Sequence, residues 1–171
     1  MSEQTFTCTP VATVVGGHTT PLDDYQGGAQ AIIRLNADFP EEVLQGIEEF
    51  SHLVLTWPFT LASPTDVELH ARSPRGNPRW PATGTFVHRN HRRPARLATS
   101  FPRLLRVNGL DLHVTDLDAV DGTPVFDLAP YFPQMGPRGT VAVPAWPGEM
   151  ITDYWADHTD RPVRVGRPAD S

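Results

Sequence analysis

The sequence predicts an all-β fold, a six- or seven-stranded, antiparallel-rich barrel with one short helix and an extended C-terminal arm. Short runs of β-branched and apolar residues recur along the chain, and turn dipeptides such as Asn108-Gly109 and Asp121-Gly122 separate them. The 18 prolines and 13 glycines leave little room for long helices. Short strands at this spacing are typical of a barrel or a sandwich.

The predicted strands follow one another with loops or turns between them. Residues 51–60 are apolar on both faces, which predicts a central strand. Asp38, Pro40 and the acids that follow predict a short helix to about Gln45, which Gly46 ends. Two hairpins are expected, one turning at Asn108-Gly109 and one at Asp121-Gly122. The predicted strands are residues 11–15, 29–35, 51–60, 67–71, 84–88, 98–107, 110–117 and 123–128.

We expect a first domain over residues 1–133 and a C-terminal arm, partly irregular, over residues 134–171. Within the arm, only residues 140–143 have the pattern of a strand. Trp146, Tyr154 and Trp155 are expected to pin the arm to a surface, and the chain beyond about Asp160 is expected to be disordered.

Composition excludes several classes of protein. No apolar run approaches the roughly 20 residues of a membrane helix, and the first residues lack the pattern of a signal peptide, so we expect a cytoplasmic protein that does not enter a membrane. A single cysteine, Cys8, rules out an internal disulfide and a cysteine-rich metal site.

Positive charge is concentrated in one part of a chain whose net charge is −6. Nine of the 14 basic residues, all of them arginine, lie within residues 72–106, and that segment has no Asp or Glu. Such a block predicts an anionic partner, either a carboxylate or a phosphate. The less specific alternative is a solvated surface run.

Three familiar kinds of site are disfavoured. The sequence has no glycine-rich phosphate loop between a strand and a helix, which excludes a Rossmann or P-loop nucleotide site. His88 and His91 are spaced like metal ligands, but no third ligand lies nearby and the surrounding arginines would repel a cation, so we expect no metal. Ser51 and His52 are adjacent and should face opposite ways on a strand, which argues against a serine hydrolase.

Two loops of opposite charge remain as the candidate site. The basic loop 89–96 and the acidic segment 116–131 could meet at one end of a barrel. Together they could bind a zwitterion, with arginines for its carboxylate and aspartates for an amine or for ribose hydroxyls. The alternative is that the two loops only neutralise each other as a salt-bridge network.

Three stretches together resemble the TsaA-like family, the β-barrel methyltransferases that include the bacterial tRNA adenine-N6 methyltransferase TrmO. Residues 47–57 read IEEFSHLVLTW, residues 84–100 read GTFVHRNHRRPARLATS, and residues 114–131 read VTDLDAVDGTPVFDLAPY. The resemblance covers about residues 10–133, and the last stretch is its most specific part.

The resemblance implies a barrel that binds S-adenosylmethionine (SAM) without a Rossmann fold, as a homodimer whose cofactor site lies near the subunit boundary. Carried over by position, the residues that would line the cofactor site are Ser51, His52, Arg89, Thr99, Asp118, Asp121, Gly122 and Thr123. SAM carries a carboxylate, an ammonium group and a ribose diol, which is the kind of zwitterion that the two loops could bind.

This chain departs from the family pattern at Asn90-His91 and over residues 95–98. We therefore expect a SAM-dependent N-methyltransferase that transfers a methyl group to a nitrogen of a small molecule. The alternatives are a tRNA adenine-N6 methyltransferase like TrmO and a non-catalytic SAM-binding barrel. If the acceptor nitrogen is protonated, His88, His91 or Asp118 could serve as its base.

Overall fold

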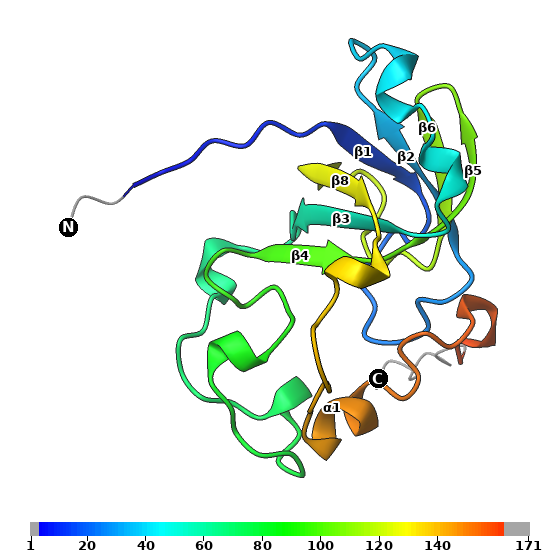
Figure 1. The fold of residues 1–171 in the computed structure, drawn as a ribbon. Coiled ribbons are helices and arrows are strands. Elements are labelled where there is room, and N and C mark those ends of the chain that lie inside the picture. The colour runs from blue at the N-terminus through cyan, green and yellow to red at the C-terminus, as the bar shows by residue number, and fades with distance from the viewer. Residues whose placement is uncertain (1–3, 163–171) are drawn as a thin grey trace, which may run out of the picture.

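The computed structural model describes residues 4–162 of the chain, and most of its regular structure is β (Figure 1). The only α-helix in this range is α1 (Ala145–Met150), and none of the helices described has the length and apolar character needed to cross a membrane. The strands of these residues are β1 (Ala12–Gly16), β2 (Gln30–Leu35), β3 (Leu53–Pro58), β4 (Leu97–Ser100), β5 (Arg103–Asn108), β6 (Asp111–Thr115), β7 (Pro124–Val125) and β8 (Asp127–Pro130).

The strands form two antiparallel sheets. The larger sheet has the order β5-β6-β2-β1-β7, and the smaller has the order β4-β3-β8. The predicted all-β, antiparallel class is confirmed, and so is the central place of the strand within residues 51–60. The expected closed barrel is not confirmed, because the strands divide into two sheets.

The two sheets are joined where the chain passes from β7 to β8. Only Phe126 separates these strands, so β7 pairs with β1 while β8 pairs with β3. The N–H of Phe126 itself donates to the carbonyl of Thr56, 2.8 Å away. A second link is an isolated bridge between His52, next to the central strand β3, and Arg103 of the edge strand β5.

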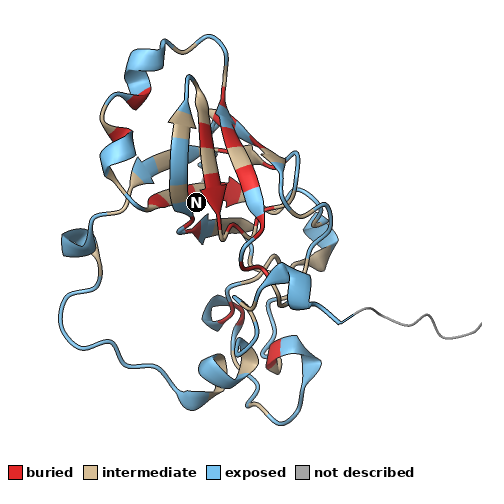
Figure 2. Ribbon diagram, turned by 90° about the vertical axis from the view of Figure 1, so that its right-hand side faces the viewer, coloured by how far each residue is buried: buried red, intermediate tan, exposed pale blue. Residues whose placement is uncertain are grey.

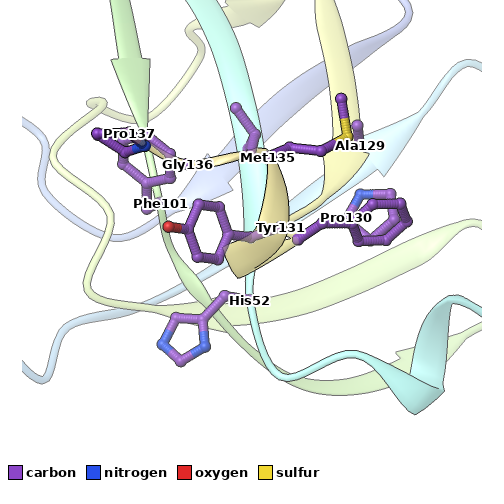
Figure 3. Close-up of a pocket in the computed structure, with 10 residues that line it drawn as sticks. His52, Phe101, Ala129, Pro130, Tyr131, Met135, Gly136 and Pro137 are labelled. Atoms are coloured by element: carbon purple, nitrogen blue, oxygen red, sulfur yellow. The ribbon is translucent and has the colours of Figure 1, made fainter. Parts of the chain in front are cut away.

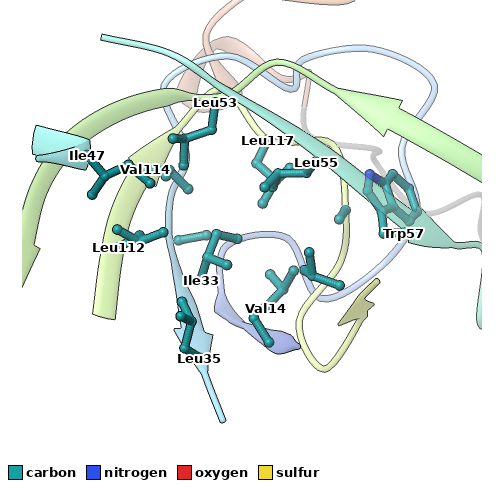
Figure 4. Packing of buried hydrophobic residues seen from close by; sticks show 14 of the residues in the cluster. Val14, Ile33, Leu35, Ile47, Leu53, Leu55, Trp57, Leu112, Val114 and Leu117 are labelled. Carbon is teal, nitrogen blue, oxygen red and sulfur yellow. The ribbon is translucent and has the colours of Figure 1, made fainter. Parts of the chain in front are cut away.

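The hydrophobic core lies between the two sheets (Figures 2 and 4). Alternate residues of each strand point into it, as the pleat of a strand requires. Val14 and Ile33 enter from the larger sheet, and Leu53 and Leu55 from the smaller, all of them at most 1% exposed. Leu117 and Ala119, on the connection that follows β6, are buried with them.

The hairpin at Asn108-Gly109 is confirmed, since β5 and β6 pair across it with Asn108 opposite Asp111. The expected hairpin at Asp121-Gly122 is wrong. Those two residues do form a turn, with Gly122 in the left-handed region at φ 81°, but β6 pairs with β2 and β5 while β7 pairs with β1. The connection after β6 crosses from one strand to another that is not its neighbour, which a local turn signal cannot reveal.

Three other predicted strands are wrong. Residues 67–71 and 140–143 are irregular, and Thr85–Val87 is a single turn of 3-10 helix. Leu69 and Phe86, 70% and 80% exposed, show that these apolar residues meet no second sheet. The whole stretch from residue 59 to 96 extends away from the sheets as loops (green in Figure 1).

The short helix expected over residues 38–45 is present as one turn of 3-10 helix, Glu41–Leu44. Gly46, at φ 85°, ends it as expected and leads into a second turn, Ile47–Glu49. The other 3-10 turns of the described chain are Pro64–Asp66, Pro74–Gly76, Pro133–Met135 and His158–Asp160. The disorder predicted beyond about Asp160 concerns mainly residues outside the described range.

Ile33 tests the importance of the packing between the sheets. Replacing this fully buried side chain in Ile33→Ala should lower the free energy of unfolding by about 2–5 kcal/mol, through lost burial and an unfilled cavity. Ile151→Ala is the matched control, because Ile151 is 42% exposed and should cost less than about 1 kcal/mol. Urea denaturation followed by circular dichroism measures both, and equal costs would contradict a core centred on Ile33.

Candidate functional site

A half-buried carboxylate, that of Asp118, organises the candidate site. The hydroxyl of Ser100 donates to Oδ1 of Asp118, and the hydroxyl of Tyr154 donates to Oδ2 at 2.5 Å. Trp57 Nε1 donates in turn to Ser100 Oγ at 2.9 Å. We call these four residues the Asp118 cluster. Both oxygens of the carboxylate are held by donors from different segments, so its orientation is fixed.

The fold places each member of the cluster for a local reason. Ser100 is the last residue of β4 and faces inward opposite Leu55, while Trp57 is an inward residue of β3. Asp118 lies between two residues that the core buries, Leu117 and Ala119. Because neighbouring side chains on extended backbone alternate, burial of those two directs the carboxylate of Asp118 away from the core.

Arg89 borders the cluster through the neighbour of Ser100. Its Nη2 donates to the backbone carbonyl of Thr99 at 3.1 Å, and its other guanidinium N–H groups have no partner among residues 4–162. The side chain of Thr99 itself is exposed and lies on the opposite face of the sheet from Ser100.

The Tyr154 phenol is a neutral donor over the whole physiological range. Burial raises the pKa of this phenol most, and the charge of Asp118 and the hydrogen bond to it raise the pKa further. Arg89 and Arg75 act in the opposite direction but do not offset these effects. Tyr154 therefore donates to Asp118 and does not take a proton from it.

The predicted turn residues lie at a different place, against the end of β1. Asp121 Oδ1 accepts from the N–H of Gly16 at 2.8 Å, and the N–H of Gly122 donates to the carbonyl of Val14 at 2.8 Å. Thr123 is buried, and its hydroxyl has no hydrogen-bond partner among the residues described. No hydrogen bond or ion pair within residues 4–162 joins Arg89 to Asp121.

Ser51 and His52 lie at the start of β3, where the side chain of Ser51 lies 2.8 Å from His52 Nδ1. We expected the two side chains to face opposite ways. They are in contact because Ser51 lies before the first residue of β3, so the alternation of side chains along a strand does not apply to it. His52 also borders an open apolar groove of about 900 Å³ on the outer side of the smaller sheet. Phe101, Tyr131 and Met135 line the groove with it (Figure 3).

The three candidate bases are not brought together. His88 is buried, its Nε2 lies 3.1 Å from the Thr83 hydroxyl, and its ring lies beside that of Trp146. His91 packs edge-on against Phe59. Within the described range, no hydrogen bond connects either histidine to Asp118, which is the one candidate base inside the cluster.

The arginines of residues 72–106 are largely used inside the fold. Arg75 pairs with Asp24 at 2.8 Å, Arg79 with Glu149 at 3.9 Å and Arg103 with Asp116 at 3.8 Å. Glu68 pairs with Arg72 at 3.5 Å and also with Arg92. The acids come from outside the segment, so a local count of charge overstated the free positive charge.

Sequence reasoning missed Trp57, Ser100 and Tyr154 as site residues. Ser100 ends one of the three stretches that carry the family resemblance. It is also a polar residue on the inward face of β4, and a polar side chain at such a position was an available signal. Tyr154 was expected to anchor the arm, but nothing in the sequence indicates that Asp118 is its partner.

The raised pKa of Tyr154 predicts a loss of stability in alkali. Above pH 10, the ordinary value for this group, the unfolded chain releases a phenol proton that the folded chain keeps. The unfolding free energy should therefore fall as pH rises from there, and Tyr154→Phe should remove that part of the slope. Urea midpoints between about pH 8 and about pH 11 measure it. An unchanged slope in Tyr154→Phe would contradict the buried hydrogen bond.

Comparison with known proteins identifies the family to which this chain is similar. A family model described as tRNA-methyltransferase O N-terminal domain matches residues 18–136. The mouse tRNA (adenine(37)-N6)-methyltransferase is 34% identical over 92 residues, which are 54% of this chain and 21% of that protein. A Pyrococcus abyssi protein named as a probable S-adenosyl-L-methionine-binding protein is 35% identical over 109 residues, 61% of this chain and 55% of its own.

A solved structure agrees with the fold. The crystal structure of TrmO from Pseudomonas aeruginosa matches with a TM-score of 0.65 at 23% identity, covering 82% of this chain and 61% of that one. The chain thus spans between about a fifth and about three fifths of the length of these proteins. The family expected from the three sequence stretches is confirmed: this chain belongs to the family of the tRNA-methyltransferase O N-terminal domain.

Proposed function

We propose that the chain is a SAM-dependent N-methyltransferase whose cofactor site is built on the Asp118 cluster and Arg89. The observation that carries this proposal is the carboxylate of Asp118, held at both oxygens, together with the Arg89 guanidinium, which donates to the carbonyl of Thr99 next to Ser100. The names of the relatives support the class of enzyme and the cofactor.

The residues present fit the polar groups of SAM. Each oxygen of Asp118 accepts one hydrogen bond in the structure and keeps a lone pair that can accept from an ammonium or a ribose hydroxyl. Arg89 has N–H groups left for a carboxylate.

When bound, SAM supplies an electrophilic methyl group on a sulfonium. The chain itself has to orient the cofactor and the acceptor nitrogen, exclude water from between them, and bind the charged groups of the cofactor. Asp118 is suited to orienting a ligand group, because two hydroxyl donors hold both of its oxygens in place. His88, buried and bonded to Thr83, is poorly placed as a base, and His91 stays a candidate only if the acceptor reaches Phe59.

For the acceptor we propose the adenine of a tRNA. The names of relatives favour this alternative over the small-molecule acceptor that the sequence led us to expect. Arg79 and Arg103 form only long ion pairs, with side chains 77% and 57% exposed, and could release them to phosphates. Phe86, exposed in the same region, could stack on a base.

A small-molecule acceptor remains the second candidate because of the apolar groove beside His52. Its size of about 900 Å³ and its aromatic lining suit a compact organic molecule. The homodimer implied by the resemblance stays a prediction, and the same groove, with Phe101 and Phe132 partly exposed, is the apolar face that a second copy could cover.

Cofactor binding is the first test. Asp118→Asn and Arg89→Ala should each weaken SAM binding about ten-fold or more, because each removes a charged hydrogen-bonding group. Asp38→Asn and Arg138→Ala are matched controls, since both residues are exposed and lie outside the cluster. Calorimetry with SAM and with S-adenosylhomocysteine gives the dissociation constants. Wild-type affinity in both site variants would show that the site is misplaced.

The acceptor is tested with labelled SAM. Total tRNA should gain labelled N6-methyladenine in the presence of the chain, whereas a metabolite extract should gain no labelled product. Binding to tRNA should weaken on the order of ten-fold or more between about 50 and about 200 mM salt if several phosphates are contacted. A labelled small molecule with unlabelled tRNA would instead support the second candidate.

A further inference from the structure

We propose that Tyr154 is a positioning residue of the cofactor site, holding Asp118 in its working orientation from a segment that lies beyond the family domain. This inference rests on the proposed function. The family match ends at residue 136, so it assigns no role to Tyr154 or to its neighbours.

Tyr154 and Ser100 each donate a hydrogen bond to a different oxygen of the Asp118 carboxylate. Ser100, from β4, binds Oδ1, and Tyr154 binds Oδ2 at 2.5 Å. Ser100 is itself held by Trp57, so one side of the carboxylate is fixed within the sheet. Among the described residues, the other side is fixed only by Tyr154 of the C-terminal segment. Without Tyr154 the carboxylate could turn about its bond to Cβ, and a ligand would have to order it on binding.

The segment that carries Tyr154 is joined to residues 25–28 by backbone hydrogen bonds. Tyr25 N donates to the carbonyl of Asp153 at 2.9 Å, and Gln26 N to that of Tyr154 at 2.8 Å. Gly27 N donates to the carbonyl of Ala156 at 3.1 Å. This pairing fixes the backbone of Tyr154, which directs its side chain to Asp118.

Gly27 is the residue that allows so close an approach. A Cβ atom at this position would collide with the backbone carbonyl oxygen of Trp155. Residues 25–28 also contact the connection after β6 that carries Asp118, because the N–H of Gly28 donates to Asp116 Oδ1 at 2.9 Å. Residues 25–28 thus lie between the C-terminal segment and the connection that carries Asp118.

The role of Tyr154 follows from this arrangement. Its phenol stays neutral and donates one hydrogen bond, so it contributes no charge to a ligand. Its effect on the cofactor must therefore pass through Asp118. That distinguishes it from a residue that merely stabilises the fold, whose loss would weaken binding whether or not Asp118 is intact.

A double-mutant cycle with SAM as the probe tests the proposal in the full chain. Tyr154→Phe should weaken SAM binding about ten-fold, since one hydrogen bond to a charged group is lost. In the Asp118→Asn background, the same substitution should have little further effect. Gly27→Ala should also weaken binding by displacing the segment, whereas Gly148→Ala, in α1 where a Cβ meets no neighbour within 4 Å, should bind as wild type.

The outcomes separate this proposal from the proposed function. Wild-type affinity in Tyr154→Phe, or an equal loss from it in the Asp118→Asn background, overturns the role of Tyr154 and leaves the proposed function standing. If the wild-type chain binds no SAM, the proposed function fails and the role of Tyr154 fails with it. Tyr154→Phe keeps the ring and every backbone contact, so the test does not depend on Gly27→Ala folding.

Discussion

The sharing of one chain segment between two sheets is the constraint on which the structure depends. β7 pairs with β1, β8 pairs with β3, and only Phe126 lies between them, so the sheets must converge along this line. Convergence encloses the core and buries Leu53, Leu55 and Trp57, the inward side chains of β3. The connection from β6 to β7 then has to cross the edge of the core. Leu117 and Ala119 are buried in that crossing, and Asp118 emerges between them.

A half-buried carboxylate needs hydrogen-bond donors, and the fold supplies the hydroxyl groups of Ser100 and Tyr154. Neutral donors stabilise the charge of Asp118 without cancelling it, so its negative charge remains available to a cationic ligand group. Arg89 donates to the backbone carbonyl of Thr99, the residue before Ser100. Among the described residues no hydrogen bond or ion pair joins Arg89 to Asp118, so neither group is used up by the other.

Most of the other arginines of residues 72–106 lie in the loops and hold them in place. A stretch from residue 59 to 96 that has little apolar packing of its own is tied to the rest of the molecule by pairs such as Arg75 with Asp24 and Arg79 with Glu149. Trp80 Nε1 adds a hydrogen bond to Glu149. These contacts bring the loops and α1 together, which explains how segments outside the family match come to lie near the site.

The sequence by itself determined the antiparallel β class, the central strand, the Asn108-Gly109 hairpin and the family, because these depend on local patterning and on short motifs. It also indicated Arg89 and Asp118, which carry charge in recognisable stretches. Only the tertiary structure decided that β7 leaves β6 for β1, that the predicted strand at residues 84–88 is a turn, and that Tyr154 and Ser100 hold Asp118. The physical reason is that strand pairing and hydrogen bonding between distant residues depend on where a shared core brings them, and local sequence carries no record of that.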